Sequence, residues 1–225
     1  FEGLSKLQIP FVSSEVETPI GDAQGLSVSR LRSTRTDHAA IGKGMTRLYR
    51  LDAAAADIAA CFGAQAGKDP WVGGYAAPGR PAPIVSRDAK SRMRRVGPMF
   101  WGVPPPPRGT DPITSVRNLD SPFWVGTLRH SEFRCLIPAT SFALWSGAEG
   151  ARRQHWFAVT DQPIFAIAGI IRFADEIPTY AMLTTDPNRL VAHHHSGAMP
   201  LILPAEARER WLTADWKDAR ELVTP

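Results

Sequence analysis

Arg134-Cys135-Leu136-Ile137-Pro138 and Ser141-Phe142-Ala143-Leu144-Trp145 form an apolar block in the second half of the chain. A short apolar run bounded by polar residues is typical of a buried strand, and we predict one over 134–137. Leu144 and Trp145 are interpreted from this pattern as core-packing residues. Similar runs predict three more strands further along the chain, over 156–160, 164–171 and 179–184.

The segments around this block predict a mixture of strands and short helices. Strands are expected over 82–87, 92–101 and 201–203, with a polar turn at 88–90. A helix is expected over 52–63, with Asp52 as N-cap and Gly63 as its stop, and another from Asp186, which caps a first turn begun by Pro187. Further helical segments are expected within 118–133 and over 205–212 and 216–222. Because helices and strands interleave without a regular βαβ repeat, the fold class is predicted to be α+β.

The first 44 residues differ from the rest of the chain. They are rich in Ser, Thr and Gly, show no sustained hydrophobic period, and contain five basic and five acidic side chains. We interpret residues 1–44 as a flexible extension or a non-native start, and residues 45–225 as a single domain. The 44% hydrophobic content of the 225-residue chain is sufficient for a core.

Positive charge is concentrated in one part of the chain. The net charge is only +4, but the segment 80–108 carries one acidic residue, Asp88, and seven basic ones: Arg80, Arg87, Lys90, Arg92, Arg94, Arg95 and Arg108. Such a basic stripe favours a polyanion through phosphate contacts and counterion release. The alternative is a solvated segment with ordinary surface charge.

Membrane insertion, disulfides and metals are not indicated. No apolar run approaches the roughly 20 residues that span a bilayer. Cys61 and Cys135 lie in apolar segments and are expected to be buried thiols, which favours a reducing, cytoplasmic location. Three consecutive histidines, residues 193–195, alternate faces if the segment is extended, so they are a poor metal site. We expect no metal, no other cofactor and no membrane partner, and a monomer.

Six short motifs occur in a specific order along the chain. They are Met45-Thr46-Arg47-Leu48-Tyr49, Trp101-Gly102-Val103-Pro104, Ser115-Val116-Arg117-Asn118, Arg134–Pro138, Ser141–Trp145 and His195-Ser196-Gly197-Ala198-Met199-Pro200. Together they resemble the SOS response-associated peptidase family, the SRAP domain, from about Met45 to the C-terminus. The resemblance implies a SRAP-like fold with mixed or antiparallel, strongly curved sheets and short flanking helices. It also implies single-stranded DNA and abasic-site DNA as partners, with covalent bonding to abasic sites.

The resemblance also assigns catalytic positions, and three of them are substituted here. The family carries a cysteine after the initiator methionine, an Asn, a Glu and a His, with an Arg two residues after the Asn. In this chain the corresponding residues are Thr46, Ser115, Leu144 and His195, and the arginine is Arg117.

The substituted side chains are chemically poorer. A hydroxyl needs a neighbouring base where a thiolate does not, so Thr46 could react with an aldehyde only if its own α-amine were free. Leu144 cannot transfer a proton, a contribution that is often about 10²–10⁴-fold. Ser115 can hydrogen-bond but reaches less far than Asn.

These substitutions leave three hypotheses of function. The favoured one is a protein that binds single-stranded or damaged DNA with reduced or lost catalysis. The others are an active crosslinker through an N-terminal Thr46, if Met45 is the true start, and a structural or protein-interaction domain without catalysis. Peptidase activity, implied by the family name, would also need the missing cysteine.

Seven residues are the expected DNA contacts. Among the tryptophans, residue 101 is expected near the binding face, and residues 124, 145 and 156 are expected to be largely buried. The expected contacts are Arg47, Arg94, Trp101, Gly102, Arg117, Thr184 and Thr185.

Overall fold

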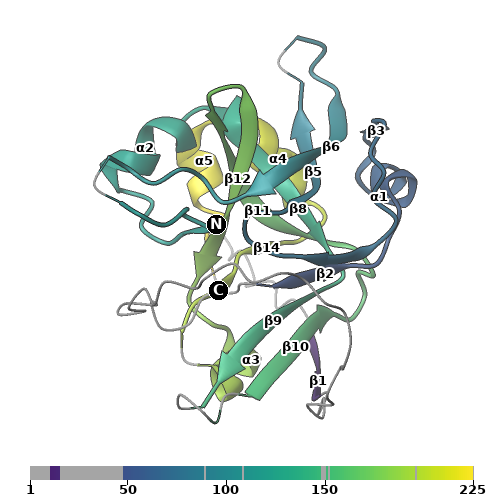
Figure 1. Cartoon of the computed structure of the whole chain (residues 1–225), viewed down its shortest axis with the longest axis vertical. Coiled ribbons are helices and arrows are strands. Elements are labelled where there is room, and N and C mark those ends of the chain that lie inside the picture. Colours follow the sequence, from purple (N-terminus) through teal and green to yellow (C-terminus); the bar gives the residue numbers. More distant parts are fainter. Residues whose placement is uncertain are drawn as a thin grey trace, which may run out of the picture.

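The computed structural model describes residues 11–15, 48–88, 90–107, 109–147, 151, 153–195 and 197–224. Within these residues the strands form two sheets, with short helices packed around them (Figure 1). The smaller sheet is five-stranded and antiparallel, in the order β1-β10-β9-β2-β4. Its strands are β1 (Phe11–Glu15), β2 (Tyr49–Leu51), β4 (Gly74–Ala76), β9 (Ser141–Ser146) and β10 (Arg153–Val159).

The larger sheet has nine strands and closes on itself. Strand β6 pairs antiparallel with β5 and parallel with β12, so β12, β11, β8, β5 and β6 form a closed ring. The short strands β3, β7, β13 and β14 pair with members of this ring. The bounds are β3 (Gln65–Ala66), β5 (Pro81–Arg87), β6 (Arg94–Trp101), β7 (Ser115–Val116), β8 (Arg134–Ala139), β11 (Phe165–Ala174), β12 (Ile177–Thr185), β13 (Met199–Pro200) and β14 (Ile202–Leu203).

Buried aromatic side chains join the two sheets. Tyr49 on β2 and Tyr180 on β12 are fully buried, and their hydroxyl groups are 2.7 Å apart in a hydrogen bond. The Trp101 ring lies against both, with centroids 5.3 Å from Tyr49 and 6.2 Å from Tyr180. Because burial disfavours the phenolate, it raises the pKa of both tyrosines above the usual range. The core is therefore continuous between the sheets.

The helices are short and lie at the outside of the strands. In Figure 1, α2, α4 and α5 gather near one end of the molecule, α1 lies beside β3, and α3 lies beside β9 and β10 at the other end. Their bounds are α1 (Ala55–Phe62), α2 (Pro122–Leu128), the 3₁₀ helix η1 (Ser131–Phe133), α3 (Arg189–His194), α4 (Ala207–Thr213) and α5 (Trp216–Arg220).

Two predicted helix starts are wrong. Helix α1 begins after Ala54, whose N–H donates to the Asp57 carboxylate, and the Asp52 carboxylate pairs with Arg50 and does not cap the helix. Helix α3 begins after Asn188, whose side-chain oxygen accepts from the Val191 N–H. The predicted stop at Gly63 is confirmed, since this residue adopts the left-handed conformation (φ 56°) that favours glycine.

The α+β class and the curved, mixed sheets with short helices are confirmed. Each predicted strand overlaps an observed one, with ends that agree to within three residues. Three burial expectations are wrong: Cys61 is exposed, Trp145 is 44% exposed, and Trp101 lies in the core. Cys135 is buried as expected, and this raises the pKa of its thiol. None of the helices in the described part of the chain is long and apolar enough to cross a membrane.

Candidate functional site

The end of β12 and the adjoining strand β7 bring several predicted site residues together. Ser115 on β7 lies opposite Met182 in a parallel pair and is nearly buried. The Thr184 hydroxyl donates to the Val116 carbonyl at 3.3 Å, which fastens the two strands where both end. Thr185 is the last residue of β12 and pairs with Met199. Arg117, directly after β7, therefore leaves the sheet beside the residue that follows β12.

That residue, Asp186, holds Arg117 in an ion pair. The side chains of Arg117 and Asp186 are 45% and 73% exposed, so water screens their attraction. Exposed ion pairs of this kind contribute little stability, and the guanidinium can exchange a carboxylate for a phosphate at small cost. The sequence did not reveal this partner, because Asp186 was interpreted as a helix cap.

His195 connects the end of α3 to β9. It is buried, its backbone is extended, and its Nδ1 lies 2.8 Å from the Trp145 carbonyl oxygen. A carbonyl oxygen only accepts hydrogen bonds, so Nδ1 must carry the proton and donate. In the neutral ring Nε2 is then the acceptor nitrogen, which is the form that a general base requires.

Leu144 is a core residue. It is 1% exposed on β9, opposite His155, whose Nε2 lies 2.7 Å from the Ser146 hydroxyl oxygen. The position that the resemblance assigns to the family's glutamate thus holds a buried apolar side chain. The structure therefore brings Leu144 to the same strand segment that fixes His195, and the titratable side chain opposite it is His155, which is hydrogen-bonded to Ser146.

The first family motif adjoins the same strand. The Leu48 carbonyl accepts from the Ala143 N–H at 3.0 Å, so the chain enters β2 alongside β9. Thr46 and Arg47 lie outside the described residues, and their predicted roles stay predictions. A covalent mechanism depends on Thr46.

The residues of the Trp101-Gly102 motif have structural contacts. The buried Trp101 indole N–H donates to the Thr114 carbonyl at 2.9 Å, so the ring packs in the core and not at a binding face. Gly102 has φ 127° and its N–H donates to Tyr180; a Cβ here would lie 3.0 Å from a carbon of Pro112. Only glycine fits this position without strain.

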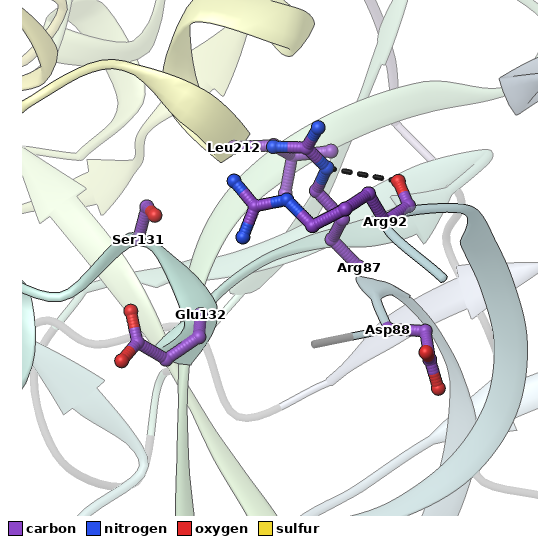
Figure 2. A pocket seen from close by; sticks show the side chains of 6 residues that line it. All are labelled: Arg87, Asp88, Arg92, Ser131, Glu132 and Leu212. Carbon is purple, nitrogen blue, oxygen red and sulfur yellow. Dashed lines mark hydrogen bonds between the residues drawn. The ribbon is translucent and has the colours of Figure 1, made fainter. Parts of the chain in front are cut away.

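Much of the predicted basic stripe is engaged by other protein groups. Arg94 donates to the Phe62 carbonyl and pairs with Glu209, so this expected DNA contact is already occupied. Arg95 faces Asp88. Figure 2 shows a narrow hollow beside the turn of the β5–β6 hairpin, where the Arg87 Nε donates to the Arg92 carbonyl. Glu132 also lines this hollow and offsets part of its charge.

The three consecutive histidines are not in one extended segment. His193 and His194 end α3, and only His195 is extended. The ring of His194 lies near two other imidazoles, with centroids 4.8 Å from His155 and 5.1 Å from His193. Within the described ranges, no three His, Cys, Asp or Glu side chains are placed so that they could hold a metal ion.

A model of the SOS response associated peptidase (SRAP) family matches residues 45–225. The chain belongs to the SRAP family. The match covers β2 to the last described residues, and thus includes both sheets apart from β1. Within this SRAP domain lie Ser115, Arg117, Leu144 and His195.

Solved structures confirm the SRAP-like fold. A crystal structure of a protein from Bordetella bronchiseptica is 21% identical, with a TM-score of 0.66, and the match covers 80% of this chain and 93% of that one. A protein from Bacteroides thetaiotaomicron is 21% identical, with a TM-score of 0.64 and coverage of 79% and 86%. A phage-related protein from Bordetella bronchiseptica is 18% identical, with a TM-score of 0.60 and coverage of 79% and 87%. No curated protein matches the chain.

Proposed function

We propose that this SRAP domain binds single-stranded DNA, including strands with abasic sites, without the family's full covalent chemistry. The observation that carries the proposal is the contrast between two family positions. Arg117 presents an exposed guanidinium at the end of β7, whereas Leu144 is buried apolar surface. A phosphate contact is thus available at one family position, and a proton-transfer group is missing at the other.

The remaining chemistry at the site is modest. His195 is held by its Nδ1 hydrogen bond to the Trp145 carbonyl, but the carboxylate and the thiol that act with a histidine in the family are replaced by Leu144 and Thr46. Groups that act as a unit are strongly non-additive, so one retained histidine restores little rate. Binding through Arg117 requires none of these groups.

A salt titration tests the binding. The full chain is mixed with a fluorescent single-stranded oligonucleotide containing one abasic site, and anisotropy is measured between about 50 and 200 mM salt. We expect Arg117→Gln to weaken binding and to reduce the slope of log affinity against log salt by about 0.7, the value for one phosphate contact on a single strand. Asp186→Asn removes the competing carboxylate and is expected to tighten binding.

The outcomes separate the three hypotheses. Absence of binding at the lowest salt would overturn the proposal and favour a protein-interaction domain. A covalent adduct in the intact mass after denaturation, lost in Thr46→Ala, would establish the active crosslinker instead. Binding without an adduct is the result that we expect.

A further inference from the structure

One face of the five-stranded sheet turns away from the core and carries large aromatic side chains. Along β9 the side chains alternate, with Phe142 and Leu144 in the core and Trp145 exposed. Along β10, Phe157 packs in the core, whereas Trp156 is partly exposed. Strand β4 contributes Tyr75, which is 58% exposed. Exposed aromatic side chains on a sheet need an explanation other than core packing.

Two of these rings meet across the sheet. Tyr75 and Trp156 have ring centroids 5.8 Å apart and an interplanar angle of 51°, although β2 and β9 separate their strands. The residues between them are Arg50, opposite Tyr75, and the small residues Ser141 and Ala143 of β9. Small side chains on the intervening strand leave space for the two rings to approach.

The guanidinium group of Arg50 lies beside these two rings. The guanidinium carbon of Arg50 lies 5.5 Å from the Tyr75 ring centroid, within cation–π range. The same guanidinium pairs with Asp52, and both side chains are about half exposed. Because exposed ion pairs are weak, Arg50 can turn to a phosphate while the ring stays in place.

We propose that Tyr75 and Trp156, with Arg50, form a stacking platform for unpaired nucleobases. Aromatic rings beside an arginine are the surface on which single strands stack, and stacking tolerates any sequence because every base has a π-face. The positive charge of Arg50 suits a strand that carries a phosphate for each base. The inference rests on the proposed function and names a further surface for it.

Strand β9 of the platform also carries the carbonyl group that holds His195. Trp145 lies two residues beyond Ala143, on the same face of β9, and its carbonyl accepts the hydrogen bond from His195. The adjacent His194 packs against His155 and Phe157, which are core-facing residues of β10, so the end of α3 lies on the opposite face of the sheet from the two rings.

The experiment compares two probes of equal length on the full chain. One is a single-stranded oligo(dT) of roughly ten nucleotides, a typical site size, and the other is a base-free tetrahydrofuran strand with the same phosphates. Tyr75→Ser is expected to weaken oligo(dT) binding about 10-fold or more, the value of one stacked base, and to leave base-free binding unchanged. Tyr75→Phe keeps the ring and is expected to retain wild-type affinity.

Matched variants separate this proposal from the previous one. Phe173→Ser removes a ring that is 59% exposed on the β11–β12 hairpin and should change neither affinity. Arg117→Gln should weaken both probes. If Tyr75→Ser changes neither affinity while Arg117→Gln weakens both, the platform is overturned and the proposed function stands. Equal weakening of both probes by Tyr75→Ser also overturns the platform, and failure of the wild type to bind either probe overturns both proposals.

Discussion

The Leu144 side chain shows how one residue redirects a site. Its neighbours in the sheet offer a core environment, and His155, opposite it, already has a partner in Ser146. A carboxylate placed here would have to leave water for a largely apolar surrounding. Leucine at this position therefore contributes to the packing of the core, and it also removes a side chain that could transfer a proton.

Replacing Leu144 tests how much this side chain contributes to the stability of the core. We expect Leu144→Gln to lower the free energy of unfolding by about 2 kcal/mol or more, through lost packing and a buried amide. Leu144→Glu should lose more stability as the pH rises above about 4.3. Burial raises the pKa of a carboxyl group in the folded state, so the unfolded carboxyl ionises first and the unfolded chain is favoured. Urea unfolding at several pH values measures both; stability of Leu144→Glu equal to the wild type would show that polar partners remain.

The buried hydroxyl groups of Tyr49 and Tyr180 make the stability of the fold dependent on pH in the alkaline range. Burial raises the pKa of Tyr49, Tyr180 and Cys135, so these groups stay protonated when folded while the unfolded chain ionises from about pH 8.5 upward. Stability is thus expected to fall through that range. Tyr49→Phe should cost about 1 kcal/mol at pH 7 and make the alkaline decline shallower, measured by unfolding between pH 7 and 11. Tyr75→Phe, an exposed counterpart, should do neither; an unchanged decline in Tyr49→Phe would contradict the assignment.

At the scale of single residues, the sequence pointed to the candidate site residues but not to the groups that surround them. The motifs located Ser115, Arg117, Leu144 and His195. They did not reveal that Arg117 pairs with Asp186, 69 residues away, because pairing over such a separation depends on the packed fold. Leu144 and Trp145 were both predicted to pack in the core, but adjacent residues of a strand point to opposite faces, so Trp145 is exposed where Leu144 is buried.

At the scale of elements, apolar runs predicted the strands well and polar residues predicted the helix starts poorly. A strand such as β8 is buried along its whole length, so its sequence is one apolar run. A capping residue has competing partners, and Asp52 is taken by Arg50. Strands β2, β4 and β9 were not predicted by range, and the two-residue strands β3, β7 and β13 are too short to carry a detectable period.

Two glycines, one at the end of a helix and one inside a helix, allow a matched test of how a helix is terminated. Gly63 ends α1 with φ 56°, so Gly63→Ala is expected to cost about 1 kcal/mol through strain in the left-handed conformation. Gly126 lies inside α2, and a Cβ there meets no atom within 4 Å. Gly126→Ala should therefore stabilise by roughly 0.5–1 kcal/mol. Thermal unfolding measures both, and equal signs for the two variants would contradict this reading of α1.

At the scale of the whole molecule, closure of the barrel was beyond sequence reasoning. Parallel pairing of β12 with β6 brings Thr179 opposite Phe100, and the Tyr49–Tyr180 hydrogen bond spans 131 residues. Such contacts depend on every intervening element. The family resemblance supplied the fold, and the strand pattern alone gave only its class.

Strand β1 lies outside the family match and covers an edge of the sheet. It pairs with β10, from Phe11 with Val159 to Glu15 with His155. A chain limited to residues 45–225, our predicted domain, would leave the β10 backbone groups on that side unpaired, and an exposed edge invites strand addition. We expect this shorter chain to keep its fold by circular dichroism but to self-associate more with concentration than the full chain, measured by light scattering. Equal association of both chains would show that β1 does not protect the edge.

Because the two cysteines differ in burial, their rates of reaction with a thiol reagent can report how often the barrel opens. Cys61 is exposed on α1, whereas Cys135 lies on β8 between β5 and β11. A thiol reagent should modify Cys61 at once and Cys135 only during excursions that part these strands. The delay between the first and second mass increments would then measure how often the barrel opens under native conditions. DNA that binds only the closed form should lengthen that delay.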